Sequence, residues 1–178
     1  LSKSTIPNLI TMIGSTETAK KVISDSSTSI KKYSMELGGN APFIVFDDAD
    51  LDNAINIGAA IKFGNCGQIC VAANRFFVHE KVYDKFLNGL IEKAKNLKIG
   101  YSEDLDFDIG PLISKNSRDR ITNLIKNTID SGGNLEYGGG IPEMNGNWFE
   151  PTVISGINES MSIFHEEIFG PVASIIKF

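Results

Sequence analysis

Apolar residues along the chain form two kinds of pattern. Short apolar runs with the length and β-branched content of strands occur at residues 9–13, 41–46, 75–79, 135–137, 152–154 and 172–178. Apolar residues at helical spacing predict helices at residues 17–24, 50–63, 81–97 and 114–131. Strands that alternate with helices predict an α/β fold with a mostly parallel sheet flanked by helices. Because the run at 41–46 is apolar throughout, we expect it to be buried on both faces of that sheet.

Composition narrows the class of protein. The 178 residues are 42% hydrophobic and 22% charged, the profile of a globular protein with a substantial core. A net charge of -5 without a basic cluster argues against nucleic-acid partners, and no apolar run approaches a membrane span. Two cysteines and no apolar signal sequence favour a cytoplasmic protein over a disulfide-stapled secreted one. The chain begins with Leu1 and ends in a strand without a closing element, so we expect it to be a fragment.

A cysteine lies in a glycine-bearing loop just after the second predicted helix. The segment reads Gly-Asn-Cys-Gly-Gln-Ile-Cys at residues 64–70 and ends in Cys70. A loop glycine allows backbone N–H groups to approach a ligand, and a thiolate that attacks a carbonyl needs such a donor for the developing oxyanion. The backbone N–H of Cys70 itself can be that donor. The alternative is a buried structural cysteine, and position alone leaves both interpretations open.

Two carboxylate segments are further candidates for chemistry. Glu36 comes shortly before Gly38 and Gly39, where a carboxylate facing a cleft can act as a general base toward water. Glu167 lies in an acidic pair that precedes Phe169 and a Gly-Pro turn, and it can accept hydrogen bonds from ribose hydroxyls. The alternatives are a solvated glutamate at the end of a strand and an ordinary charged loop.

The sequence contains one weak candidate for a phosphate site and none for a metal site. Gly14, Ser15 and Thr16 follow a predicted strand and open a predicted helix, where free N–H groups and the helix dipole favour a phosphate. A single Gly-Ser-Thr segment is a weak signal by itself. His79 and His165 have no paired ligand spacing with each other or with a cysteine, so the sequence predicts no metal site.

Together these segments resemble the aldehyde dehydrogenase superfamily. The matching motifs, in chain order, are Gly-Ser-Thr at 14–16, Glu-Leu-Gly-Gly at 36–39, Gly-Gln-Ile-Cys at 67–70, Asp-Ile-Gly-Pro-Leu at 108–112 and Glu-Glu-Ile-Phe-Gly-Pro-Val at 166–172. The 34 residues from Glu36 to Cys70 (70 minus 36) also fit the family spacing. Residues 34–50 and 70–78 look most like the succinate-semialdehyde dehydrogenase branch.

The resemblance implies an enzyme that oxidises an aldehyde to a carboxylic acid with NAD or NADP. Cys70 would attack the aldehyde to form a thiohemiacetal, hydride would pass to the nicotinamide, and Glu36 would help water to hydrolyse the resulting thioester. The implied cofactor contacts are Glu167 and Phe169 at the nicotinamide ribose, Gly14 and Ser15 near the pyrophosphate, and Leu37 and Gly38 beside the nicotinamide.

The resemblance also implies a domain organisation. Residues 1–35 would be the last strand-helix unit of a Rossmann-type NAD(P)-binding domain, and residues 36–178 a catalytic domain that is incomplete at its C-terminus. The full-length protein would be a homo-oligomer. Because much of the cofactor site would lie upstream of Leu1, we expect the isolated chain to be inactive or nearly so. The choice between NAD and NADP stays open for the same reason.

The substrate is less determined. The succinate-semialdehyde branch places an arginine six residues before the nucleophile to pair with the substrate carboxylate, and here that position is Gly64. Succinate semialdehyde and small neutral or hydroxylated aldehydes, such as lactaldehyde or glyceraldehyde, therefore stay as alternatives.

Two competing roles for the chain stay open, and so does the role of the second cysteine. The first alternative to a dehydrogenase is a truncated remnant of the family that is kept for binding or assembly. The second is a thioester hydrolase that uses the same Cys70 and Glu36. For Cys66, one hypothesis is a reversible disulfide with Cys70, four residues away. The other is that Cys66 only packs beside the loop.

Overall fold

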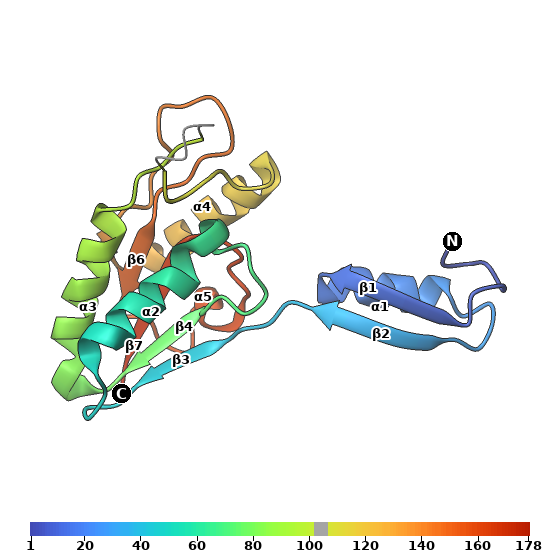
Figure 1. The fold of residues 1–178 in the computed structure, drawn as a ribbon, viewed down its shortest axis with the longest axis horizontal. Coiled ribbons are helices and arrows are strands. Elements are labelled where there is room, and N and C mark those ends of the chain that lie inside the picture. The colour runs from blue at the N-terminus through green and yellow to red at the C-terminus, as the bar shows by residue number, and fades with distance from the viewer. Residues whose placement is uncertain (102–106) are drawn as a thin grey trace. The chain divides into compact units, whose positions relative to one another are not determined.

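The computed structural model describes residues 1–101 and 107–178, and the chain divides into two compact units (Figure 1). The first unit is Leu1–Gly39 and the second is Asn40–Phe178. The sequence predicted a domain boundary after residue 35. That the two parts are the end of a cofactor-binding domain and a catalytic domain stays a prediction. Glu36, Leu37 and Gly38 belong to the first unit.

The first unit is a strand, a helix and a second strand. Strand β1 (Leu9–Gly14) pairs in parallel with β2 (Lys32–Leu37), and helix α1 (Thr16–Asp25) connects them. The pattern predicted β1 and α1 but not β2, because β2 is mostly polar and largely exposed and so lacks an apolar run.

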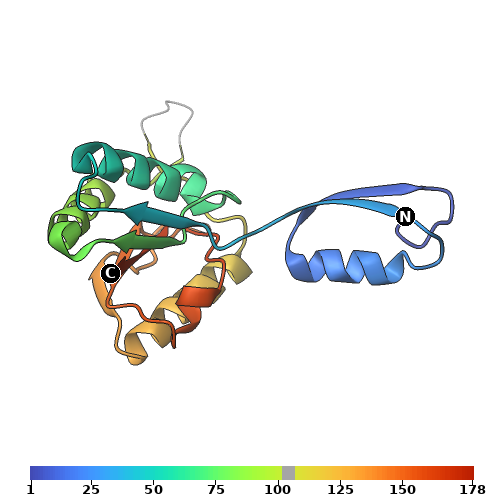
Figure 2. The same ribbon diagram turned by 90° about the horizontal axis from the view of Figure 1, so that it is seen from below.

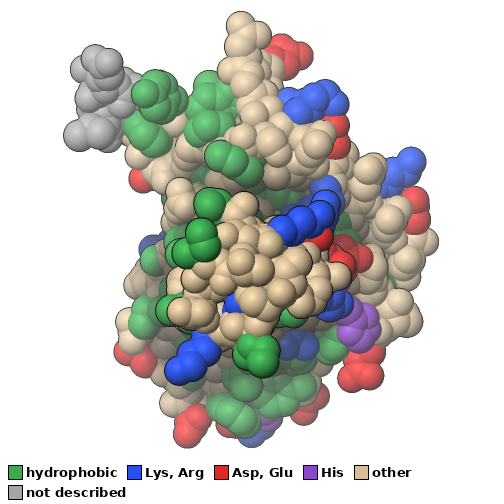
Figure 3. Space-filling view, turned by 90° about the vertical axis from the view of Figure 1, so that its right-hand side faces the viewer, with side chains coloured by type: hydrophobic (Ala, Val, Ile, Leu, Met, Phe, Trp, Pro, Cys, Tyr) green, Lys and Arg blue, Asp and Glu red, His purple; other side chains and the backbone are tan. Residues whose placement is uncertain are grey.

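This first unit buries little apolar surface. Within Leu1–Gly39, all of which the structure describes, Ala19 is the one fully buried apolar side chain. Ile6, Ile13 and Ile30 are each at least 85% exposed. Figure 3 shows apolar side chains interspersed with charged ones on the face that it draws. A two-stranded sheet with one helix therefore has only a small core of its own.

The second unit contains a five-stranded sheet in the order β3-β4-β7-β6-β5. The strands are β3 (Pro42–Val45), β4 (Arg75–Val78), β5 (Asn134–Tyr137), β6 (Thr152–Ser155) and β7 (Val172–Lys177). All neighbouring pairs are parallel except β5 and β6, which are antiparallel. The predicted mostly parallel sheet is thus confirmed.

The expectation that residues 41–46 are buried on both faces is wrong. Strand β3 lies at the edge of the sheet, where Ile44 is 56% exposed and Val45 is buried. The strands buried on both faces are two of the three inner ones, β6 and β7. An apolar run shows that a segment is a strand, but its place in the sheet depends on which strands pair with it.

Helices cover both faces of this sheet (Figure 2). They are α2 (Leu51–Phe63), a 3-10 helix (Gly64–Gly67), α3 (Glu80–Lys95), α4 (Lys115–Asp130) and the short α5 (Ser162–His165). Asp50 and Ser114 cap α2 and α4 by accepting from backbone N–H groups at 3.1 Å, as capping side chains do. Among the described residues, no helix has the length and apolar character that a membrane span requires.

Alternate residues of the inner strands enter two separate cores. Val153, Ala173 and Ile175 pack in one cluster with side chains of α2 and α3, including Phe86. Ile154, Val172 and Ile176 pack in the other with side chains of α4. This alternation is the period of two of a β-strand, and it produces three layers with the sheet in the middle.

The topology brings two distant loops to the same edge of the sheet. The segment that contains Cys70 lies just before β4, and the segment 166–171 lies just before β7. Because β4 and β7 are neighbouring parallel strands, with Arg75 opposite Ser174, both loops lie at their amino ends. Segments about a hundred residues apart thus become neighbours.

Candidate active site

The loop that carries Cys70 begins with a sharp left-handed turn. Helix α2 ends at Phe63, and Asn65, Cys66 and Gly67 then have φ values of 49°, 58° and 66°. Such values strain a residue with a side chain, and strained backbone is concentrated at functional sites. After the turn the chain emerges at the surface, where Cys70 is exposed.

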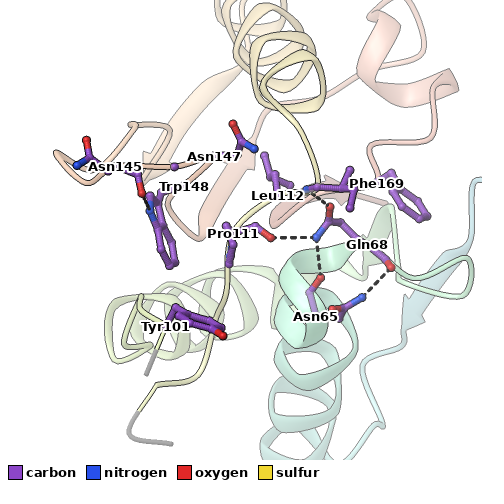
Figure 4. Close-up of a pocket in the computed structure, with 11 residues that line it drawn as sticks. Asn65, Gln68, Tyr101, Pro111, Leu112, Asn145, Asn147, Trp148 and Phe169 are labelled. Atoms are coloured by element: carbon purple, nitrogen blue, oxygen red, sulfur yellow. Dashed lines mark hydrogen bonds between the residues drawn. The ribbon is translucent and has the colours of Figure 1, made fainter. Parts of the chain in front are cut away.

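Gln68 fastens this loop to the segment 111–113. Its Nε2 donates to the carbonyl oxygens of Asn65 and Pro111, both at 3.3 Å, and its Oε1 accepts from the backbone N–H of Ile113 at 2.8 Å. Asn65 Nδ2 donates to the Gln68 carbonyl at 3.1 Å (Figure 4). One side chain therefore connects the start of the loop to a neighbouring segment.

The loop also touches the segment before β7, backbone against backbone. A Cβ atom on Gly67 would lie 2.1 Å from the carbonyl oxygen of Gly170, closer than any side chain permits. A Cβ on Gly170 would lie 2.3 Å from Ile121 Cδ1. Glycine at position 67 allows the two segments to meet, and glycine at position 170 leaves room for Ile121 of α4.

The side chains of Arg120 on α4 and of Asn74 form hydrogen bonds with the main chain of the segment before β7. Arg120 donates to the carbonyl of Glu167 at 3.3 Å and to the carbonyl of Ile168. Asn74 Oδ1 accepts from the backbone N–H of Ile168 at 3.4 Å. Phe169 has a φ of 47°. Among the described residues, the non-glycine residues with positive φ all lie in these two segments, and they are Asn65, Cys66 and Phe169.

Both segments border one pocket of about 740 Å³. Asn65 and Gln68 line it from the Cys70 loop, Phe169 from the segment before β7, and Trp148 from across the cavity (Figure 4). Glu167 is half-buried and Phe169 is 37% exposed. The predicted residues Cys70, Glu167 and Phe169 of the second unit thus lie on two adjoining, firmly held segments.

The remaining predicted residues lie together in the first unit. Gly14 is opposite Leu37, and Ile13 is opposite Glu36, at the carboxyl ends of the two parallel strands. Ser15 then caps α1 and accepts from the backbone N–H of Thr18 at 3.2 Å. Ligands of parallel α/β sheets bind at this end of the strands, and helix N-termini favour phosphate. The predicted residues of this unit therefore form one set, which is Gly14, Ser15, Glu36, Leu37 and Gly38.

The two cysteines differ sharply. Both are free, but Cys66 is 1% exposed and packs with Ile109 and Leu112 in the second core cluster. Burial raises the pKa of the Cys66 thiol to about 12, although the nearby Lys62 opposes this shift. A thiol in that state is a poor nucleophile. The interpretation in which Cys66 packs beside the loop fits its surroundings.

Sequence patterns did not reveal the residues that hold the loops. Gln68 lies within the Gly-Gln-Ile-Cys motif, so its position was visible but its role was not. Lys62 had a signal, because it falls on the apolar face of α2, four residues after Gly58 and seven after Ile55. Asn74 and Arg120 look like ordinary polar residues, and no pattern marks them.

Comparison with known proteins identifies the class of protein. The sequence profile of the aldehyde dehydrogenase family matches residues 1–178. The chain belongs to the aldehyde dehydrogenase family. The resemblance seen in the sequence and the expected fold class are thereby confirmed.

Individual relatives show how much of a family member the chain covers. It is 43% identical to succinate-semialdehyde dehydrogenase [NADP(+)] 2 of Schizosaccharomyces pombe over 100% of the chain and 36% of that protein. It is 39% identical to D-glyceraldehyde dehydrogenase (NADP(+)) of Thermoplasma acidophilum over 96% of the chain and 35% of that protein. The crystal structure of betaine aldehyde dehydrogenase from Staphylococcus aureus in complex with NAD+ has a TM-score of 0.94 and 34% identity, and the match covers 99% of the chain and 36% of that structure. The chain spans about a third of the length of these relatives.

The contact between Gly67 and Gly170 predicts the effect of one added methyl group. Gly67→Ala should destabilise the protein by about 3 kcal/mol or more, because alanine would be strained at a φ of 66° and would collide with the Gly170 carbonyl. Gly64→Ala is the matched control, since a Cβ there meets no heavy atom within 4 Å. Urea unfolding measures both, and equal effects of the two substitutions would contradict the close contact.

The different burial of the two cysteines predicts selective alkylation. Iodoacetamide should modify Cys70 in the folded protein at least about tenfold faster than Cys66, because Cys66 is buried and its thiol is protonated. Peptide mass spectrometry after timed quenching measures both rates, and the same reaction in urea is the control in which the difference disappears. Equal rates in the folded protein would show that the loop opens readily.

Proposed function

We propose that the protein containing this chain oxidises an aldehyde to a carboxylic acid with NAD or NADP, and that Cys70 is its nucleophile. The observation that carries the proposal is the placement of an exposed Cys70 on a tightly held loop, directly against the segment with Glu167 and Phe169. Membership of the family over the whole chain supports it.

Cys70 begins the reaction in this proposal. Its thiolate adds to the aldehyde carbon, and the oxygen of the thiohemiacetal takes up negative charge. The backbone N–H of Cys70 donates to that oxygen, and the loop that holds it is fixed beforehand by Gln68. A donor that needs no rearrangement stabilises the developing charge most effectively.

The residues expected to hold the dinucleotide fit it. Gly14 and Ser15 lie between the carboxyl end of β1 and the first turn of α1, which suits a pyrophosphate, with Leu37 and Gly38 on the neighbouring strand end. Glu167 presents a half-buried carboxylate suited to ribose hydroxyls, and Phe169 presents an aromatic face. When bound, NAD or NADP supplies the acceptor for the hydride that leaves the substrate carbon as the thioester forms.

Glu36 completes the cycle. Its carboxylate is exposed at the end of β2, and it takes a proton from the water that attacks the thioester carbon. The carboxylic acid product leaves, and Cys70 is released as a thiolate. Separate residues thus carry the formation and the hydrolysis of the acyl intermediate.

The substrate in this proposal is a small aldehyde. The similar proteins act on succinate semialdehyde, D-glyceraldehyde and betaine aldehyde according to their names, so relatives differ in whether the substrate carries a carboxylate. Gly64 offers no cation to a substrate carboxylate, which favours a neutral or hydroxylated aldehyde for this protein.

The direct test measures aldehyde oxidation by the natural gene product. We expect NAD(P)-dependent turnover that Cys70→Ser abolishes and that Glu36→Gln reduces by about a hundredfold or more, because the first loses the nucleophile and the second the base. Cys66→Ala is the matched control and should keep the activity.

Two results would contradict this proposal. A natural protein that binds partners without turnover would be a non-catalytic remnant of the family. Hydrolysis of thioesters with no dependence on NAD(P) would identify a hydrolase that uses the same Cys70 and Glu36.

The identity of residue 64 predicts a change in specificity. Gly64→Arg should raise the activity on succinate semialdehyde relative to a neutral aldehyde by about tenfold, because a guanidinium pairs with a carboxylate through two hydrogen bonds. A Cβ at this position meets no heavy atom of the described residues within 4 Å, so the first atom of a side chain is accommodated there. Gly64→Gln is the control of similar length without charge. If Gly64→Arg and Gly64→Gln have the same ratio of kcat/KM for succinate semialdehyde over the neutral aldehyde, residue 64 does not determine the specificity.

A further inference from the structure

Lys62 is a fully buried lysine beneath the Cys70 loop. Its side chain is 0% exposed in the last turn of α2, just before the left-handed turn. Burying an amine costs free energy that an apolar side chain of the same length would not, so its presence needs a polar partner. Burial lowers the pKa of the Lys62 amine to about 7, while Cys66 and Glu167 shift it in the opposite direction.

One polar partner of Lys62 is Asn74, which also reaches the segment before β7. Lys62 Nζ donates to Asn74 Oδ1 at 3.5 Å, and the same oxygen accepts from the backbone N–H of Ile168 at 3.4 Å. Asn74 Nδ2 donates to the carbonyl of Glu166 at 3.4 Å. Asn74 is 2% exposed, so these bonds lie away from water.

Lys62 and Asn74 lie at the two ends of the loop that contains Cys70. Lys62 precedes the loop and Asn74 follows it, four residues after Cys70. The residues that Asn74 binds, Glu166 and Ile168, flank Glu167 and come just before Phe169. The pair therefore connects both ends of the nucleophile loop to the segment expected at the nicotinamide ribose.

We propose that Lys62 and Asn74 are positioning residues, a buried polar brace that sets the distance between Cys70 and the Glu167–Phe169 segment. The brace rests on the proposed function, since its purpose is to place the thiohemiacetal carbon against the nicotinamide. It complements the contact between Gly67 and Gly170, which prevents the two segments from coming closer but does not prevent them from separating.

The brace affects one of two reactions of Cys70. Hydride transfer requires the substrate carbon on Cys70 and the nicotinamide at a fixed separation, and a misplacement of about 1 Å can lower such a rate about a hundredfold. Hydrolysis of an activated ester by Cys70 requires no nicotinamide. A loss of the brace should therefore lower aldehyde oxidation and leave ester hydrolysis unchanged.

The test compares both activities in the natural gene product with Lys62→Met and Asn74→Leu. Each should lower the kcat of NAD(P)-dependent aldehyde oxidation by about tenfold or more and change ester hydrolysis by less than about twofold. Lys62→Met should not lower the unfolding temperature, because methionine fills the space without a buried amine. Asn74→Asp keeps the oxygen that Lys62 and Ile168 share but loses the donor to the Glu166 carbonyl, so it should lower aldehyde oxidation less than Asn74→Leu does.

Thr128→Val is the matched control for the loss of a buried polar group. Thr128 is 1% exposed on α4, and its hydroxyl donates to the carbonyl of Leu124 within the same helix at 2.7 Å. Thr128→Val should leave the ratio of aldehyde oxidation to ester hydrolysis unchanged. If Lys62→Met and Asn74→Leu lower both activities in parallel with the unfolding temperature, their role is only structural and the proposal is wrong.

Hydrogen exchange separates this proposal from the proposed function. In Lys62→Met, amide exchange should increase together in peptides that cover residues 64–70 and 166–170, whether or not the protein oxidises aldehydes. Faster exchange in one peptide alone, or in neither, would overturn the brace. A wild-type protein without NAD(P)-dependent oxidation would overturn the proposed function and, with joint exchange, leave the brace standing as a structural coupling of the two loops.

Discussion

The backbone of Gly67 lies against the carbonyl oxygen of Gly170, and the candidate site of the second unit depends on this contact. A Cβ on Gly67 would be 2.1 Å from that oxygen, so no residue with a side chain fits. The contact arises because β4 and β7 are neighbouring parallel strands whose preceding loops meet at one end of the sheet. It fixes the segment that ends in Cys70 beside the segment that contains Glu167 and Phe169.

The strain and the buried lysine of the second unit are concentrated where these segments meet. Asn65, Cys66 and Phe169 have positive φ, and the Lys62 amine lies in a dry environment beneath them. Positive φ values and a buried amine both lower the stability of the fold. The two apolar clusters on either side of β6 and β7 offset this loss. A rigid core beneath strained loops is a suitable arrangement for holding reacting groups in place.

Sequence predicted helices α1 to α4 and most strands because their apolar patterns are local, but it did not predict the short α5 or the 3-10 helix. It failed for β2, which is polar and exposed, and for the burial of β3, which depends on strand order. The motifs marked Cys70 and Glu36 but not the residues that hold the loops. The bond between Asn74 and Ile168 joins residues 94 apart, and no local pattern indicates such a contact. Lys62, a charge on an apolar helix face, was the exception with a visible signal.

The most direct measurement is a mass-spectrometric search for an acyl group on the natural protein with Glu36→Gln. This variant should form the thioester and hydrolyse it slowly, so the acyl group should accumulate. We expect an acyl group on Cys70 after incubation with an aldehyde and NAD(P), and none when the dinucleotide is omitted. An acyl group on another residue, or none in the presence of NAD(P), would contradict the assignment of Cys70 as the nucleophile.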